Sequence, residues 1–293
     1  MHKVLVNIMC SFVPSKDLRH KLRKKLRKDP TQTERVIFDI LSATAQQKMA
    51  SLIYNSSTSA ITHQKIFGEY KGKFFGQEVV LVAAGPTARG YRPVKGAVHV
   101  GCNRSFMLES LALDFLFLAD FRGISSFMQE FIDYKGNNCV KFIGDLKGVS
   151  GQQIPEDFFL KLNNTRKYKT DFGLGGYCGI IPVDIDFNPL WASSTIAHQA
   201  FQFILFTNPK RIYLVGCDCT GHLAGHFLKG EGDSAINKSL SRQEWDFTVS
   251  EMIKGWSKLK DFANLYYPDT EIISINPIGL KGMFNDQFIT YIP

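Results

Sequence analysis

The sequence contains no apolar run near the roughly 20 residues that a helix needs to cross a bilayer, so no membrane-spanning segment is predicted. It does not begin like a secretory signal peptide, because its short apolar run at 4–13 precedes a basic stretch instead of following one. Cysteine is scarce, with 6 in 293 residues, and only Cys217 and Cys219 lie close together in the sequence. A disulfide framework is therefore not indicated, and we expect reduced thiols in a cytoplasmic protein.

Acidic residues are outnumbered, and the excess positive charge is concentrated near the N-terminus. The chain has 35 Lys and Arg against 27 Asp and Glu, a net charge of +8. Eight of the cations fall in residues 16–28 beside a single acid, Asp17. Leu18, Leu22 and Leu26 recur there every four residues, which predicts a basic helix with a narrow apolar stripe. This helix either packs on the protein through its leucines or lies on an anionic membrane surface.

The rest of the chain is close to neutral and has no basic face interleaved with aromatic residues, so nucleic-acid binding is not predicted. Residues 1–76 are assigned to a basic helical N-terminal segment and residues 77–293 to an α/β domain. Six apolar runs predict strands, at 78–83, 97–100, 115–119, 140–143, 212–215 and 271–274. Helical stretches between them cover 105–113, 125–134, 195–206 and 242–262. This alternation predicts a Rossmann-like, mainly parallel sheet with helices on both faces.

The residues that follow the strands are the candidate site, because open parallel sheets bind ligands beyond the carboxyl ends of their strands. Gly85, Pro86 and Thr87 form the turn after the first strand, where glycine lets a ligand approach the backbone and helix N–H groups suit a phosphate. This turn has neither the GxGxxG spacing nor a Walker lysine. Asn103 follows the second strand and Asp120 the third. A tight turn or a helix cap is the alternative use of these residues.

A second phosphate candidate is the start of the apolar helix 196–206. Ser193, Ser194 and Thr195 combine hydroxyl groups there with the amides of a helix N-terminus. Plain capping of the helix is the alternative. Asp218 follows the fifth strand in the same way as the earlier strand-end residues.

A glycine-rich loop carries the chain's one closely spaced pair of histidines, His222 and His226. Histidine is the usual general base near neutral pH, and the loop, which continues to about residue 240, is long enough to act as a mobile lid. His226 is the preferred base, since the apolar pair after it could anchor the closed loop. A zinc site from Cys217, Cys219, His222 and His226 is the alternative, although its ligands crowd into one short loop.

In order and spacing, these motifs resemble the bacterial sialyltransferases of glycosyltransferase family 42. The similar positions are Gly85-Pro86-Thr87, Cys102-Asn103, Asp120, Ser193-Ser194 and the run Leu214 to Asp218, within about residues 78–275. Ala84 replaces the family's amide, Thr195 its glycine and Asp120 its asparagine. The family's catalytic histidine precedes its last long helix, at a position that corresponds to 239–243 and holds no His here. The earlier histidines look more like a related group, the motility-associated and pterin-diphosphokinase-like proteins with the same Rossmann-like core.

The resemblance implies an inverting glycosyltransferase that moves sialic acid or a related acidic sugar from a CMP-activated donor to a bacterial surface glycan or glycolipid. Donor binding would fall to Gly85, Pro86, Thr87, Asn103, Asp120, Ser193, Ser194, Thr195 and Asp218, and catalysis to His226 or His222. No metal and no cofactor besides the donor is implied, because helix-end amides would stabilise the leaving phosphate.

The implied setting is lipopolysaccharide or capsule synthesis at the inner face of an anionic inner membrane. The resemblance does not say whether the protein is a monomer or a homo-oligomer. Two alternatives stand beside this reading. One is a Mg²⁺-dependent phosphotransferase or diphosphokinase with Asp120 and Asp218 near the phosphates. The other is a non-catalytic assembly factor for surface glycans.

Overall fold

The computed structural model describes residues 62–109, 111–118, 127–144, 161–171, 180–191, 194–220 and 241–289, together with residues 17, 20 and 24. Internal contacts divide the chain into two compact units, Met1–Asn55 and Ser56–Pro293. The leucines of the expected basic helix lie outside the described residues, so that helix stays a prediction. Every element named below belongs to the second unit.

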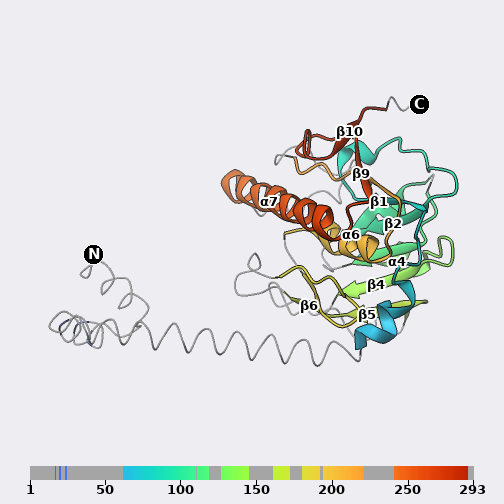
Figure 1. The fold of residues 1–293 in the computed structure, drawn as a ribbon, viewed down its shortest axis with the longest axis horizontal. Helices are drawn as coiled ribbons and strands as arrows, with labels where there is room; N and C mark the ends of the chain where they lie inside the picture. Colours follow the sequence, from blue (N-terminus) through green and yellow to red (C-terminus); the bar gives the residue numbers. More distant parts are fainter. Residues whose placement is uncertain are drawn as a thin grey trace. The chain divides into compact units, whose positions relative to one another are not determined.

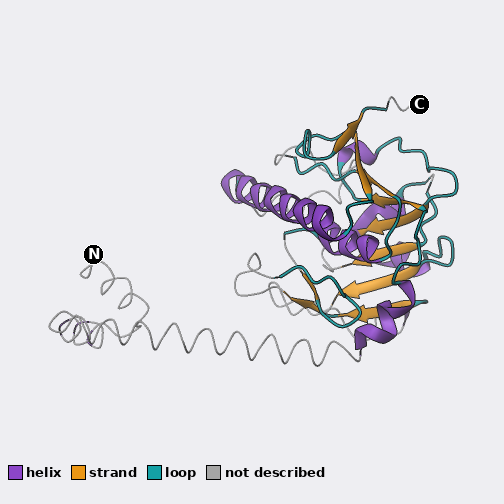
Figure 2. Ribbon diagram, viewed as in Figure 1, coloured by secondary structure: helices purple, strands orange, loops and turns teal. Residues whose placement is uncertain are grey.

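The second unit is built on an eight-stranded sheet in which all neighbouring strands run parallel (Figures 1 and 2). The strand order is β10-β9-β8-β1-β2-β3-β4-β5. The strands are β1 (Glu78–Val82), β2 (Val98–Cys102), β3 (Phe115–Leu118), β4 (Val140–Gly144), β5 (Thr165–Tyr168), β8 (Arg211–Val215), β9 (Glu271–Ile275) and β10 (Asn285–Gln287). All six predicted strands are present, and the predicted α/β fold with a mainly parallel sheet is confirmed.

The two strands that the sequence does not predict, β5 and β10, lie at the edges of the sheet. Their sequences, TRKY and NDQ, contain no apolar run. An edge strand has a neighbour on one side only and is less buried, so burial does not impose apolar residues on it. A separate two-stranded parallel sheet joins β6 (Thr170–Asp171) to β7 (Leu190–Trp191).

Side chains of the central strands alternate between two apolar cores, one on each face of the sheet. The helical elements are η1 (Gly68–Tyr70), η2 (Pro86–Ala88), η3 (Asn103–Met107), α4 (Met128–Asp133), α6 (Ile196–Phe206) and α7 (Arg242–Tyr266). In β1, Val79 and Leu81 belong to the core under α6 and α7, whereas Val80 and Val82 belong to the core under η3 and α4. Both faces are therefore covered, as the continuous apolar sequence of β1 predicts.

Residues 62–76, which the sequence pattern assigns to the N-terminal segment, pack into the core under α6. Phe67, Tyr70 and Phe74 are buried there. Phe67 stacks on Phe142 of β4 with ring centroids 5.2 Å apart. The compact unit accordingly begins at Ser56, ahead of the expected domain start at residue 77.

α6 is buried along its whole length, which agrees with its nearly continuous apolar sequence. Thr195 caps its start, where the side-chain oxygen accepts a hydrogen bond from the Ala197 N–H at 3.3 Å. The side chain of Gln202 accepts from the Trp191 N–H at 3.0 Å and donates to the Trp191 carbonyl at 2.8 Å. These bonds hold α6 against β7 and satisfy the buried amide of Gln202.

α7 starts with a capping box, in which Ser241 Oγ accepts from the Glu244 N–H at 3.3 Å and Glu244 Oε2 accepts from the Ser241 N–H at 2.8 Å. α7 lies beside α6 (Figure 1), and Gly255 allows the close approach, since a Cβ there would lie 2.3 Å from Cε1 of His198. Although α7 has 25 residues, neither it nor any other described helix is both long and apolar enough to span a membrane.

Candidate functional site

The strand order reverses between β1 and β8, which makes this pair the topological switch point of the sheet. From β1 the chain builds the sheet outward through β2, β3 and β4, and β8, β9 and β10 follow on the other side. The strand ends stay joined, because the Ala83 N–H donates to the Val215 carbonyl at 2.8 Å and the Gly85 N–H to the Gly216 carbonyl at 2.9 Å. Open parallel sheets bind ligands in the crevice at such a point.

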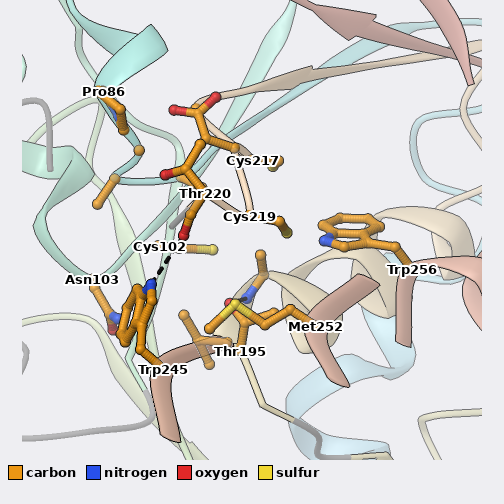
Figure 3. A pocket seen from close by; sticks show the side chains of 17 residues that line it. Pro86, Cys102, Asn103, Thr195, Cys217, Cys219, Thr220, Trp245, Met252 and Trp256 are labelled. Carbon is orange, nitrogen blue, oxygen red and sulfur yellow. Dashed lines mark hydrogen bonds between the residues drawn. The ribbon is translucent and has the colours of Figure 1, made fainter. Parts of the chain in front are cut away.

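A pocket of about 140 Å³ opens at this edge of the sheet (Figure 3). Its walls come from the segments that follow β1, β2 and β8, from the start of α6 and from α7. Five of the predicted donor-binding residues line it, namely Gly85, Pro86, Asn103, Thr195 and Asp218. They come from four segments far apart in the sequence, so the strand-end pattern identifies residues that the fold brings together.

The other predicted residues are beside the pocket or outside the described part of the chain. Thr87 and Ser194 are described and directly follow or precede lining residues. Asp120, Ser193, His222 and His226 lie outside the described residues. The choice of base and the zinc alternative therefore stay predictions. Within the described residues, no group of three or more His, Cys, Asp or Glu side chains could hold a metal ion.

The Asp218 side chain is buried, with 4% of its surface exposed, and both of its carboxylate oxygens accept hydrogen bonds from Thr87. Oδ2 accepts from the Thr87 N–H at 2.9 Å, and Oδ1 accepts from the Thr87 hydroxyl. Burial raises the pKa of Asp218, and the bonds from Thr87 oppose that rise. The Asp218 carbonyl accepts from the Gly279 N–H at 2.8 Å. Asp218 thus joins the β1 turn, the end of β8 and the segment after β9.

Two glycines permit this close approach of strand ends. A Cβ on Gly85 would lie 2.3 Å from both Asp218 Oδ2 and the Gly216 carbonyl oxygen. Gly216 has a φ of +67°, and a Cβ there would lie 2.7 Å from the Ala83 carbonyl oxygen. The sequence favours glycine at 85 for the approach of a ligand, and the structure adds a second reason, the approach of one backbone to another.

Asn103 is held in a left-handed backbone conformation, with φ of 49°, at the start of η3. Ser105 stabilises this turn, since its hydroxyl accepts from the Cys102 N–H at 2.8 Å. Asn103 Oδ1 is buried and has no hydrogen-bond partner in the described part of the chain. Asparagine tolerates the left-handed region better than most residues. The turn therefore fixes an amide side chain at the pocket wall.

The start of α6 presents the positive end of a helix dipole to the pocket. Thr195, Ile196 and Ala197 line the pocket. Ser194 Oγ is buried and has no hydrogen-bond partner among the described residues. A helix N-terminus carries about half a positive charge. Because α6 is buried along its whole length, water screens that charge only weakly.

One wall of sulfur and indole groups is not predicted from the sequence. It consists of Cys102, Cys217, Cys219, Met252 and Trp256 (Figure 3). Burial raises the pKa of all three thiols, that of Cys219 to about 12, so the thiols are uncharged near neutral pH. This wall offers a soft, neutral surface to a ligand.

Trp245, also unpredicted, lines the pocket from the first turn of α7. Its Nε1–H donates to the Thr220 carbonyl at 3.0 Å, the bond drawn as a dashed line in Figure 3. The sequence predicts the helix that carries Trp245, Met252 and Trp256. It does not reveal which face of that helix meets the pocket, because this depends on how α7 crosses α6.

Asp218 is the one charged side chain in the described lining, which contains no Lys, Arg or His. A ligand group with several negative charges would meet no cationic side chain among these residues. Among the described lining residues, the start of α6 is therefore the group that complements a negative charge.

Comparisons with known proteins give a weak likeness in fold. No family model and no curated protein sequence matches the chain. It is similar to the structure of the sialyltransferase CstII from Campylobacter jejuni in complex with the substrate analogue CMP-3FNeuAc, with a TM-score of 0.37, 11% identity, and 68% of this chain and 80% of that chain covered. A structure of the same enzyme with cytidine-5'-monophosphate gives a TM-score of 0.39 and 13% identity over 68% of this chain and 80% of that chain. Likeness at this level leaves the activity to be inferred from the pocket itself.

Proposed function

We propose that this pocket binds a CMP-activated acidic sugar and that the protein is a sialyltransferase-like glycosyltransferase acting on a bacterial surface glycan. The observation that supports the proposal is a switch-point pocket in which the N-terminus of a buried helix, α6, faces the strand-end residues Gly85 and Asn103. Pockets at such points hold nucleotides in many open α/β sheets, with phosphate at a helix N-terminus.

The charge of the lining favours a donor with one phosphate. In a CMP-activated acidic sugar a single phosphate with one negative charge joins nucleoside to sugar, apart from the sugar carboxylate, and the N-terminus of α6 complements the phosphate charge. A nucleoside diphosphate sugar places two charges on adjacent phosphates, which proteins usually neutralise with a metal held by carboxylates or with cationic side chains. Asp218 is the sole carboxylate in the described lining, and each of its oxygens accepts a hydrogen bond from Thr87.

Each part of the donor has a group of suitable chemistry in the pocket. Thr195 and Ser194 at the start of α6 suit the phosphate, and the Asn103 amide suits a ribose hydroxyl. The Trp245 ring offers a flat aromatic face for the base.

The reaction would be an inverting displacement at the anomeric carbon. A base, His226 or His222 in this proposal, takes the proton of the acceptor hydroxyl while the acceptor oxygen forms its bond to the anomeric carbon. The bond from that carbon to the phosphate oxygen breaks, and CMP leaves with the electron pair. The positive end of α6 stabilises the charge that develops on the leaving phosphate.

Thermal unfolding with nucleotides tests the donor. We expect CMP to raise the unfolding temperature more than UDP, ADP or ATP, with no dependence on added Mg²⁺ or EDTA. A ligand at 100 times its Kd stabilises the folded state by about 2.7 kcal/mol, which is easily detected. A larger shift with ATP and Mg²⁺ would point to the phosphotransferase instead. No shift with any nucleotide would favour the assembly factor.

A pair of variants tests the base once a donor is known. His226→Ala is expected to lower turnover by about 100- to 10,000-fold, the usual contribution of a general base, while CMP affinity stays nearly unchanged. His222→Ala should have the smaller effect. If both variants keep near-wild-type turnover, neither histidine is the base.

A further inference from the structure

We propose that Asp218 is a positioning residue that fastens the β1 turn to the end of β8, and that it is not a ligand of the donor. The role assigned to the pocket's ligand rests on the proposed function. The fastening itself rests on hydrogen bonds between Asp218 and Thr87 and can be tested without a ligand.

The turn after β1 is attached to the β8 end at two points. On one side the Gly85 N–H donates to the Gly216 carbonyl at 2.9 Å. On the other, the N–H and hydroxyl of Thr87 both donate to the Asp218 carboxylate. Pro86 lies between these attachments and lines the pocket. We call this arrangement the Asp218–Thr87 latch, and it fixes the distance between two pocket walls that are 131 residues apart in the sequence.

The latch also explains how a pocket for an anion tolerates a buried carboxylate. A free carboxylate next to a phosphate would repel it, at a cost that burial increases. In the latch, the backbone N–H and the hydroxyl of Thr87 stabilise the carboxylate directly. Because both hydrogen-bond donors of Thr87 bind Asp218, they are not available to the ligand. The turn therefore forms part of the pocket wall, and the start of α6 is the group that binds the phosphate.

Asparagine at position 218 separates the two possible roles, because it keeps the geometry and removes the charge. In Asp218→Asn, the amide oxygen accepts from the Thr87 N–H, and the amide N–H donates to the Thr87 hydroxyl oxygen. Asp218→Ala removes both bonds. Thr87→Val removes one of them, and Thr87→Ser restores the hydroxyl. Asp261→Ala, at an exposed acid on α7, is a matched control for the loss of one negative charge.

The first measurement is hydrogen exchange of the Thr87 amide in the full-length protein without ligand. We expect it to be protected in wild type, Asp218→Asn, Thr87→Ser and Asp261→Ala. In Asp218→Ala it should exchange about 10- to 100-fold faster, in line with the loss of hydrogen bonds to a charged group. Equal exchange in Asp218→Ala and wild type would overturn the latch. If Asp218→Ala does not fold, Thr87→Val, with an intermediate increase expected, decides the question.

The second measurement is CMP affinity, followed by the intrinsic tryptophan fluorescence of the protein or by calorimetry. If Asp218 is a positioning residue, Asp218→Asn keeps the CMP affinity within a few-fold of wild type. Asp218→Ala and Thr87→Val lower the CMP affinity in proportion to the loss of protection of the Thr87 amide. If Asp218→Asn keeps the amide protected but loses affinity as severely as Asp218→Ala, the charge itself contacts the ligand and the proposal is wrong. If wild type does not bind CMP, the proposed function fails, and the exchange data still decide the latch.

Discussion

His63 connects the segment before η1 to two others through both nitrogens of its ring. Nδ1 lies 2.8 Å from the Ile185 carbonyl oxygen, and Nε2 accepts from the Lys169 N–H at 2.8 Å. These partners require the neutral tautomer with its proton on Nδ1. The ring is fully buried, and burial lowers the pKa of His63. A second proton would place an N–H on Nε2 against the N–H of Lys169.

We therefore expect the free energy of unfolding to fall in mild acid. The folded state favours neutral His63, so the unfolded chain takes up the proton first, near its ordinary pKa of 6.5. The contribution is complete above that value and is lost as the pH falls toward the lower folded pKa. His198, whose pKa burial lowers to about 3, acts in the same direction. Urea unfolding at about pH 7.5 and about pH 5 measures the effect.

The variant His63→Gln identifies the source of this pH dependence. Glutamine can also donate and accept but does not titrate. The variant is expected to be less stable near neutral pH, because its geometry is poorer, and to lose less stability on acidification. An unchanged pH dependence in His63→Gln would show that the other buried histidines account for it.

Gly255 decides how closely α7 packs on α6. A Cβ at this position would lie 2.3 Å from Cε1 of His198, and the His198 ring stacks on Trp191 at 5.7 Å and meets Trp256 edge-on at 4.9 Å. The imidazole thus has an indole on each of two sides. The ring cannot move aside without disturbing the packing of both tryptophans.

Gly255→Ala is expected to destabilise the protein by about 1–3 kcal/mol, the usual cost of overpacking a core, although alanine has the better helix propensity. Ser257→Ala, at an exposed position two residues further along α7, is the control and should change stability by less than about 0.5 kcal/mol. Chemical unfolding of both variants measures the difference. Equal stabilities would mean that α7 shifts without cost. Because Trp256 also lines the pocket, Gly255→Ala should weaken CMP binding as well.

The sequence predicts elements well where burial imposes a pattern on them. β1 is apolar on both faces because both faces are covered, and it is predicted almost to the residue. β5 and β10 at the sheet edges are not predicted, because burial does not require apolar residues there and their sequences are polar. In the site, Gly85, Asn103 and Asp218 are predictable because strand ends in a parallel sheet converge on one edge.

The sulfur and indole wall is not predictable in that way. Trp245, Met252 and Trp256 reach the pocket through the crossing of α7 over α6, a property of tertiary packing that no local pattern contains. The partner of Thr87 is equally hidden, because the bond from Thr87 to Asp218 spans 131 residues. For the same reason, the sequence pattern groups Asp218 with the donor-binding candidates and does not reveal its bonds to Thr87.

For the molecule as a whole, the basic helix expected at 16–28 and the α/β unit should be separable. The described core lies between residues 62 and 289, within a unit that begins at Ser56. Deleting residues 1–30 is therefore expected to leave that unit folded and its CMP-dependent thermal shift intact. Binding to vesicles of anionic lipid should weaken steeply, at about 1 kcal/mol per cation removed. Co-sedimentation with anionic and neutral vesicles measures it.

Two outcomes would count against this division. Equal vesicle binding before and after the deletion would remove the membrane role of the basic stretch. Loss of folding would show that Leu18, Leu22 and Leu26 pack on the protein, the other reading of the leucine pattern.

The placement of β1 between β2 and β8 has a consequence for synthesis on the ribosome. One edge of β1 pairs with β2, which follows about twenty residues later in the chain. The other edge pairs with β8, where Glu78 lies opposite Arg211. A nascent chain that stops before residue 211 carries an apolar strand with one open edge, and such edges recruit strands from other chains. We therefore expect prematurely terminated products to aggregate through β1. We also expect a chaperone to bind the nascent chain until β8 has been synthesised.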